Sequence, residues 1–190
     1  MARFTIVFDA CVLYPAKLCD LLVELANADL FQAKWTEQIH EEWIRNLLEK
    51  RPDITRQQLL RRKDLMDKAV MDCLVSDYAH HIDTIELPDI DDRHVVAAAI
   101  HARANAIVTY NLKDFPGNIL RKYALEAIHP DDFLTYQMDL SEAAVLIATQ
   151  NCRRRLKNPP LTAENYLDGL RSLGLPKTVN RLRPFQKILR

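Results

Sequence analysis

Hydrophobic and polar positions alternate in blocks that predict strands and helices in turn. The first block, residues 4–9, is a run of β-branched and aromatic side chains that ends on a carboxylate, Asp9. Such continuous apolar runs are typical of strands in the centre of a parallel sheet, where both faces are covered. Because an unpaired buried carboxylate is costly, Asp9 is expected at the carboxyl end of the strand, where open α/β sheets place their ligand crevices. The alternative role for Asp9 is to cap the helix that follows.

The same alternation continues along the chain. Leucines at helical spacing predict a helix over residues 13–28, and residues 31–35 are a strand candidate with Thr36 as the N-cap of the next helix. Residues 51–81 are highly charged and are interpreted as a solvated helical pair or a flap. Further short strands are expected at residues 84–87, 106–110 and 125–128.

The helix after residue 36 carries a candidate interior acid. Ile39, Trp43 and Leu47 recur every fourth residue and define an inward stripe. At about 100° per residue, Glu42 falls on the edge of this stripe, whereas Glu41 points away from it. Of the two, only Glu42 is therefore positioned to reach an interior site. The alternative is that both are solvated helix acids.

Two more acids lie next to buried segments. Asp91 is the expected N-cap of the next helix, and Asp92 heads the buried face of that helix. Asp89 and Asp91 are accounted for as complements of the helix dipole. Asp114 lies just past the strand at residues 106–110, so it repeats the arrangement of an acid beyond a strand end.

The candidate acids are thus Asp9, Glu42, Asp92 and Asp114. If these side chains converge, their like charges raise one another's pKa unless a cation neutralises them. An all-oxygen cluster selects a hard divalent ion, Mg²⁺ or Mn²⁺. Such an ion polarises a phosphodiester and lowers the pKa of a bound water. Convergence of the acids would therefore imply phosphodiester chemistry.

Composition is that of an ordinary soluble globular protein, with 190 residues, 48% of them hydrophobic and 27% charged. The sequence has no secretion signal and no apolar stretch long enough to span a bilayer, so a cytoplasmic protein without a membrane partner is expected. No cysteine falls in a Cys-x-x-Cys pair, and free thiols are expected. The histidines are interpreted as surface residues rather than metal ligands. The four cysteines are Cys11, Cys19, Cys73 and Cys152, and the histidines interpreted in this way are His80, His81, His94 and His101.

Charge is unevenly distributed along the chain although the net charge is zero. Residues 1–150 hold 16 Lys and Arg against 24 Asp and Glu, and residues 151–190 hold 10 against 2. This asymmetry has two interpretations, which are a basic arm that meets phosphate or an acidic protein, and a tail that folds back and neutralises its own domain.

Four segments, taken in order, resemble the motifs of PIN domains in the branch of VapC-type toxins. They are residues 6–13 (IVFDACVL), 39–47 (IHEEWIRNL), 92–100 (DRHVVAAAI) and 107–115 (IVTYNLKDF). The resemblance covers about residues 4–130. Each motif is weak by itself, and the four in order are specific.

The resemblance implies a fold, an activity and a set of site residues. The fold is an α/β/α sandwich around a mostly parallel sheet, and the activity is that of a Mg²⁺- or Mn²⁺-dependent endoribonuclease. A homodimer and a small antitoxin protein that blocks the acidic pocket are also implied. By motif position, the metal-holding acids are Asp9, Glu42, Asp92 and Asp114, and Thr109 and Asn111 line the site.

One residue departs from the family pattern. The family usually has Asn two residues after the first acid, and this chain has Cys11. An amide there could hydrogen-bond the neighbouring carboxylates, whereas a thiol is a poor donor. We therefore expect a site that still binds metal but is less rigidly held and is sensitive to oxidation.

Residues 131–190 lie beyond the expected nuclease domain of residues 1–130. They are predicted to form two helices and a basic tail, with Arg153, Arg154 and Arg155 directly after the first of these helices. This extension could pack on the core, swap across a dimer, contact RNA phosphates or receive an antitoxin, and the sequence does not choose among these roles.

Two rival functions compete with the nuclease. Phosphatases with an aspartyl nucleophile also begin with a strand that ends in Asp, but they need a second acid at the position of Cys11. The other rival is a catalytically weak or inactive PIN-like module that binds RNA or protein through the same crevice. Stabilisation by Mn²⁺ or Mg²⁺ that Asp9→Asn removes would favour the nuclease.

Overall fold

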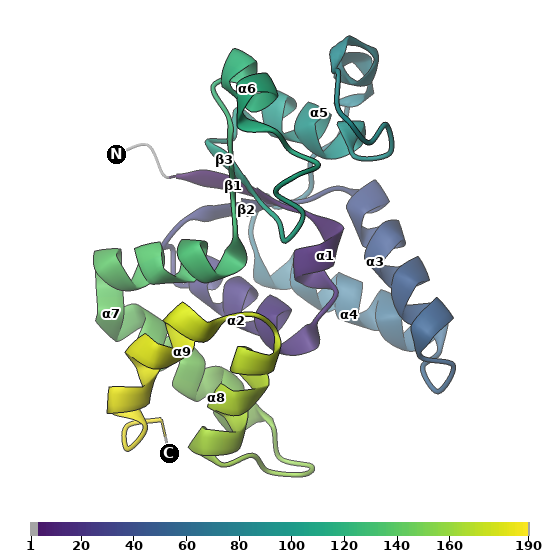
Figure 1. Ribbon diagram of the computed structural model, residues 1–190. Helices are drawn as coiled ribbons and strands as arrows, with labels where there is room; N and C mark the ends of the chain where they lie inside the picture. Colours follow the sequence, from purple (N-terminus) through teal and green to yellow (C-terminus); the bar gives the residue numbers. More distant parts are fainter. Residues whose placement is uncertain (1–3, 190) are drawn as a thin grey trace. The chain divides into compact units, whose positions relative to one another are not determined.

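The core of the fold is a parallel sheet, which Figure 1 shows beside the helices. The computed structural model describes residues 4–189, and within these residues the sheet has four strands in the order β2-β1-β3-β4, all parallel. The α/β class predicted from the sequence is confirmed. The strands are β1 (Thr5–Phe8), β2 (Gln32–Lys34), β3 (Ala106–Val108) and β4 (Glu126–Ile128).

The segments that hold candidate site residues follow the carboxyl ends of the two central strands, β1 and β3. The register pairs Phe8 with Val108, so the residues that follow β1 and β3 leave the sheet at the same edge. Both strands are buried along their whole length, which explains their continuous apolar runs. The short helix α1 (Ala10–Leu13) begins directly after β1, with Asp9 as its N-cap.

Helix α3 (Glu37–Lys50) begins at the predicted cap. The Thr36 side chain accepts a hydrogen bond from the backbone N–H of Ile39 at 3.0 Å. The inward stripe of this helix is buried, with Ile39 and Trp43 fully inaccessible. Because the stripe fixes the rotation of α3, it also fixes the direction in which Glu42 leaves the helix.

The charged segment after α3 contains one long helix, α4 (Arg56–Ala69), and then the 3₁₀ helix η1 (Ala79–Thr84). The predicted helical pair is thus only partly correct. The predicted strand at residues 84–87 is wrong, because the backbone N–H of Ile85 closes the last turn of η1 by donating to the carbonyl of Ile82 at 3.2 Å. Ile85 is nevertheless buried, which accounts for its apolar character.

Helix α5 (Arg93–His101) packs against β1, β3 and η1. Its N-cap is Asp92 and not the predicted Asp91, a displacement of one residue. After β3 the chain forms the short helix α6 (Gly117–Leu120) and the 3₁₀ turn η2 (Arg121–Tyr123) before it enters β4.

The chain divides into two compact units. One holds the chain up to Tyr14 together with Phe31–His129, and therefore the whole sheet. The other holds Pro15–Leu30 and the chain from Pro130 onward, so the early helix α2 (Ala16–Asn27) groups with the C-terminal helices. The division at residue 130 that the sequence suggested stays a prediction.

The second unit is helical. Helix α7 (Pro130–Arg155) has a non-helical residue at Ser141, and α8 (Ala163–Ser172), α9 (Pro176–Leu182) and the 3₁₀ turn η3 (Arg183–Phe185) follow. The expected two helices and basic tail are therefore wrong in detail. Arg153, Arg154 and Arg155, which were expected to follow the first of these helices, form the last turn of α7.

Ion pairs within the second unit use part of its basic charge. The Arg155 guanidinium lies 2.5 Å from the Glu24 carboxylate of α2, and the Asn151 amide donates to the same carboxylate at 2.9 Å. Arg153 donates to the Leu161 carbonyl at 2.9 Å. These interactions favour the interpretation in which basic residues near the C-terminus are neutralised by their own fold.

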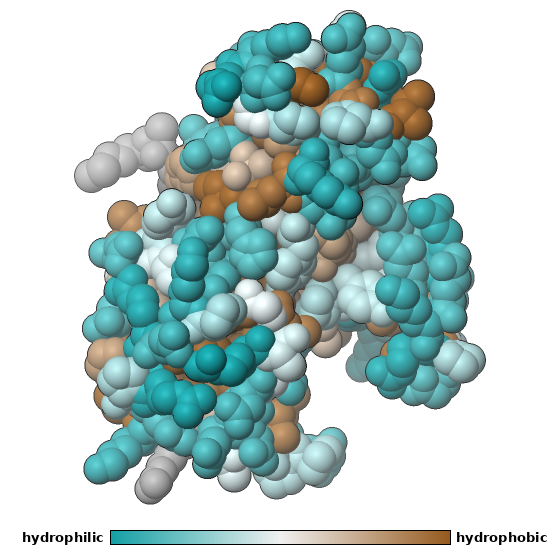
Figure 2. All heavy atoms as spheres, viewed as in Figure 1, coloured by the Kyte–Doolittle hydropathy of each residue, from teal (hydrophilic) through white to brown (hydrophobic). Residues whose placement is uncertain are grey.

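The structure also bears on the membrane and thiol predictions. Among residues 4–189, no helix combines the length and the apolar character needed to cross a bilayer. The four cysteines lie in this range and none of them forms a disulfide there, as predicted. Most side chains on the face shown in Figure 2 are hydrophilic, and the hydrophobic ones form separate groups.

Candidate functional site

The carboxylate at the end of β1 is buried and held in place by hydrogen bonds. Asp9 is 2% exposed. Its Oδ1 accepts the Ala10 N–H at 2.6 Å, and its Oδ2 accepts the Thr109 hydroxyl at 2.7 Å and the Cys11 thiol at 3.0 Å. Burial raises the pKa of Asp9, and the charge of Glu42 adds to this, whereas the hydrogen bonds lower it. Asp9 therefore stands directly after the strand and caps the helix that follows, and its role in a ligand site stays a prediction.

The segment after β3 is tied to Asp9 through two side chains. Thr109 Oγ1 accepts the Asn111 N–H at 3.0 Å while its hydroxyl hydrogen points to Asp9. The Cys11 sulfur likewise accepts the Tyr110 N–H at 3.4 Å and donates to Asp9. Thr109 and Cys11 thus each accept a hydrogen bond from a backbone N–H that follows β3 and donate one to the Asp9 carboxylate that follows β1.

The Cys11 environment differs from the one expected. Burial, together with the Asp9 charge, raises the pKa of this thiol far above its usual range. The thiolate is the form that oxidises and alkylates readily, so a protonated thiol is inert. The raised pKa therefore argues against the oxidation sensitivity that the sequence suggested. The hydrogen bonds show that the Cys11 thiol acts as both a donor and an acceptor.

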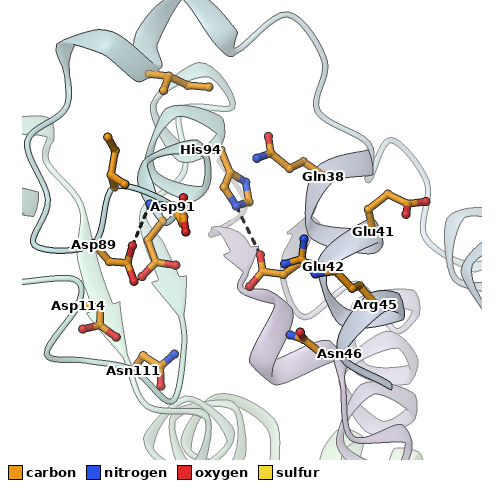
Figure 3. Close-up of a pocket in the computed structure, with 13 residues that line it drawn as sticks. Gln38, Glu41, Glu42, Arg45, Asn46, Asp89, Asp91, His94, Asn111 and Asp114 are labelled. Atoms are coloured by element: carbon orange, nitrogen blue, oxygen red, sulfur yellow. Dashed lines mark hydrogen bonds and ion pairs between the residues drawn. The ribbon is translucent and has the colours of Figure 1, made fainter. Parts of the chain in front are cut away.

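A cavity of about 540 Å³ lies in front of these strand ends. Its lining includes Glu42, Asp92, Asp114 and Asn111, so four of the predicted site residues come together there. Within the described part of the chain, the lining does not include Asp9, Cys11 or Thr109. The complete lining is Gln38, Glu41, Glu42, Arg45, Asn46, Ile82, Asp89, Ile90, Asp91, Asp92, His94, Asn111 and Asp114, most of which Figure 3 labels.

Asp92 is the electrostatic centre of the site. Although it occupies the N-cap position of α5, its side chain makes no capping hydrogen bond. Partial burial raises the pKa of Asp92 from 3.8 to about 7, and neighbouring carboxylates add to the shift. These carboxylates belong to Asp9, Asp89, Glu42 and Asp114. Asp9 thus belongs to the cluster through its charge although it lies outside the cavity lining.

The two adjacent glutamates of α3 point in different directions. Glu42 is directed toward His94 and the acids of the facing loop, whereas Glu41 points away (Figure 3). Glu41 forms an ion pair with Arg56 of α4, with Nη2–Oε2 at 2.6 Å. The two side chains differ in direction because consecutive helical residues are rotated by about 100°. Both line the cavity, so the statement that only Glu42 serves an interior site stays a prediction.

The prediction that His94 lies at the surface is wrong. The residue is 4% exposed, and its Nε2 lies 3.5 Å from Glu42 Oε2. Among the described residues, its Nδ1 is buried without a hydrogen-bond partner. His94 lies in the first turn of α5 and lines the same cavity as Asp92.

Sequence reasoning also missed residues that share the cavity face of α3. Gln38 and Asn46 stand four residues before and after Glu42, and both line the cavity. That four-residue spacing is the signal that could have found them. Asp89 and Asp91 do more than complement the helix dipole, because Asp89 raises the pKa of Asp92 and its Oδ1 accepts the Asp91 N–H at 2.9 Å.

Comparison with known proteins agrees with this architecture. Residues 5–113, more than half of the chain, match the family model described as "PIN domain". The chain belongs to the PIN-domain family. This confirms the resemblance seen in the four motifs. Residues 130–184 of this PIN-domain protein match a second family model, described as "VapC50 C-terminal domain".

One curated relative extends this similarity. It is the Mycobacterium tuberculosis (strain ATCC 25618 / H37Rv) protein named "Putative ribonuclease VapC50", to which the chain is 47% identical over 79 residues. The match covers 42% of this chain and 47% of the relative, so the PIN-domain protein matches about half the length of that relative. No solved structure matches the chain.

The donor set of the cavity fits a hard divalent cation. The Glu42, Asp92 and Asp114 carboxylates offer oxygen ligands, which Mg²⁺ and Mn²⁺ prefer over nitrogen and sulfur. Partial burial raises the pKa of Asp92 to about 7 and the like charges around it add to the shift, so a bound cation would relieve that repulsion. The residues present thus fit the metal that the family resemblance implies.

Proposed function

We propose that this PIN-domain protein is a divalent-metal-dependent endoribonuclease that hydrolyses RNA phosphodiester bonds. The observation that carries the proposal is the group of carboxylates around one open cavity. Partial burial raises the pKa of Asp92 to about 7, and the charges of four neighbouring carboxylates add to the shift. An isolated fold gains nothing from such repulsion, whereas a metal-binding site requires the charge. The family membership and the ribonuclease name of the VapC50 relative support RNA as the substrate.

Glu42, Asp92 and Asp114 would hold Mg²⁺ or Mn²⁺, with Asp9 contributing charge from beneath them. When bound, the ion would polarise the phosphodiester and lower the pKa of a water molecule. Asp9 is immobilised by Thr109 and Cys11 and thus keeps the negative charge at the strand ends in a constant position.

Other residues of the cavity would position the RNA. Arg45 is exposed and lines the cavity next to Glu42, where its guanidinium could bind a phosphate through two N–H groups. Asn46 and Asn111 would offer amide donors to the sugar and phosphate oxygens. The positive charge of Arg45 would also offset part of the repulsion between the cavity acids and the RNA backbone.

The biological setting is part of the same proposal. The matches to VapC50 support a toxin of a toxin–antitoxin pair that acts in the cytoplasm. We further propose a homodimer, and a small antitoxin protein that covers the acidic cavity with a basic segment. Residues 1–130 would form the nuclease domain and residues 131–190 the extension.

Metal-dependent cleavage of RNA tests the enzymatic part. The purified chain should cleave total RNA with Mn²⁺ or Mg²⁺ and lose this activity with a chelator. Asp92→Asn and Asp114→Asn should each lower the rate roughly 100-fold or more, which corresponds to about 3 kcal/mol of barrier. Asp64→Asn, which changes an exposed acid of α4 outside the cavity, is the matched control and should cleave normally. Undiminished cleavage by an Asp92→Asn, Asp114→Asn double variant would overturn the proposal.

The second candidate function is a PIN-like module that binds RNA or protein without cutting. It is favoured by the observation that both Asp9 oxygens are already hydrogen-bonded and that Asp9 does not line the cavity within the described residues. RNA binding in a gel-shift assay without any cleavage in Mn²⁺ would support this function over the nuclease.

A further inference from the structure

Three histidines from two elements meet at the end of α5 opposite to Asp92. His101 is the last residue of α5, and His80 and His81 stand side by side in η1. One ring nitrogen of each lies within 4.8 Å of the others. The ring centroids are 4.0 Å apart for His80 and His81, and 5.7 and 5.9 Å apart from these two to His101.

Imidazole nitrogens in this arrangement have the chemistry of a transition-metal site. Neutral imidazole suits Zn²⁺, Ni²⁺ and Cu²⁺, whereas Mg²⁺ prefers oxygen. In a tetrahedral zinc site with Zn–N bonds near 2.0–2.1 Å, two ligand nitrogens stand about 3.3 Å apart. The rings therefore need to close by at most about 1.5 Å. His80 and His101 are exposed and can turn to do so.

The surroundings of the cluster also favour a bound cation. The last carbonyls of α5 carry the negative end of the helix dipole, next to His101. Within residues 4–189, none of the three imidazole rings has a hydrogen-bond or carboxylate partner, so nothing competes for the ring nitrogens. The packing of η1 on α5 brings these rings together, although His80 and His101 are 21 positions apart in the sequence.

We propose that His80, His81 and His101 bind one transition-metal ion of the zinc class, at a site separate from the acidic cavity. Three protein ligands would leave the fourth tetrahedral position to water. Helix α5 has 9 residues, so its two ends are about 13 Å apart, and this distance separates His101 from Asp92.

The consequence of such binding is a clamp between η1 and α5. Ile82 of η1 lines the acidic cavity, and the loop that carries Asp89 follows η1 directly. An ion held by both elements would fix this loop relative to Asp92 and stabilise the native state by mass action. Its role would be structural, and it requires no nuclease activity.

Binding of Co²⁺ to the full chain, freed of any affinity tag and treated with a chelator, tests the site. Co²⁺ in tetrahedral nitrogen coordination gives visible absorption bands, and Zn²⁺ should displace it. One equivalent should bind with these tetrahedral bands, and the melting temperature should rise. Loss of a direct ligand should weaken binding by more than the roughly 10–100-fold that loss of an outer-shell partner costs. His101→Gln and His81→Gln should both show this effect.

Two control variants make the result decisive. His129→Gln removes a histidine that contacts the Tyr110 ring edge to face, outside the cluster, and should bind Co²⁺ as the wild type does. The Asp92→Asn, Asp114→Asn double variant should also bind normally, which separates this site from the proposed nuclease. Normal binding by a folded His101→Gln variant, or loss of binding in the double acid variant, would overturn the proposal.

Discussion

The Thr109 hydroxyl donates a hydrogen bond of 2.7 Å to Asp9 Oδ2, which connects the carboxyl ends of β3 and β1 across 100 residues of sequence. Thr109 is fully buried and Asp9 nearly so. Because hydrogen bonds to an ionised acceptor are the strong ones, this interaction lowers the pKa of Asp9 against the effect of its burial.

Replacing Thr109 by Val should therefore weaken both stability and metal binding. Valine keeps the shape of the side chain but removes the donor to Asp9 and the acceptor for the Asn111 N–H. We expect a loss of about 1–3 kcal/mol in the free energy of unfolding. Urea denaturation measures this loss. Thr109→Ser retains the hydroxyl and should lose less, so equal losses in the two variants would assign the effect to packing instead.

The thiols should be inert in the native protein. The pKa of Cys73 is raised to about 11 and that of Cys152 to about 12 by burial, that of Cys11 is raised further still, and Cys19 is fully buried. Since only thiolates react readily, Ellman's reagent near pH 8 should label the folded chain slowly and all 4 cysteines after denaturation. Rapid labelling of Cys11, identified by mass spectrometry, would contradict the buried environment of its sulfur.

The metal-free protein should become less stable as pH rises toward 7 because of Asp92. Its folded pKa of about 7 exceeds its ordinary value of 3.8, so between these values the folded state holds a proton that the unfolded chain has lost. The resulting penalty is absent below about pH 4 and complete above about pH 7. Asp92→Asn should thus be more stable than the wild type at neutral pH, by on the order of 1 kcal/mol after solvent screening.

Thermal melts with a chelator check this dependence. The gain of Asp92→Asn should amount to roughly 2–4 °C near neutral pH and should shrink as pH falls toward 5. The exposed control Asp64→Asn should show no such trend. Excess Mn²⁺ should make the wild type melt at a higher temperature than Asp92→Asn, since only the wild type would gain the full binding energy of the ion. A constant difference at every pH would refute the coupling of the carboxylates.

Asp67 of α4 should be important for stability because it accepts two buried donors. Trp35 Nε1 lies 2.8 Å and His40 Nε2 2.9 Å from Asp67 Oδ1. His40 Nδ1 accepts the Trp43 N–H at 3.0 Å, so the ring proton must lie on Nε2 and point to Asp67. This chain of bonds holds α3, and with it Glu42, in place.

Asp67→Ala should therefore cost about 2–4 kcal/mol, because it leaves the buried N–H groups of Trp35 and His40 without an acceptor. Chemical denaturation gives this number directly. Asp64→Ala lies one turn earlier on the same helix with an exposed side chain and should change stability by less than about 0.5 kcal/mol. Similar values for the two variants would remove the proposed role of Asp67.

Local features of this protein were determined by the sequence alone. The apolar run before Asp9, the Thr36 cap and the stripe that separates Glu42 from Glu41 all follow from the geometry of a few neighbouring residues. The four motifs in order were also sufficient to recognise the PIN-domain family. Such features can be predicted from the sequence because the strand and helix periods span only a few residues.

Only the tertiary structure decided which polar residues are buried and which of them meet. His94 is buried against Glu42, the Cys11 sulfur joins β1 to the β3 end, and α2 groups with the C-terminal helices. The histidine cluster likewise exists because η1 packs on α5. These pairings join residues that are far apart along the chain. Periodicity tells which face of an element is apolar, but the partner of that face depends on how loops close and on the packing of the whole unit.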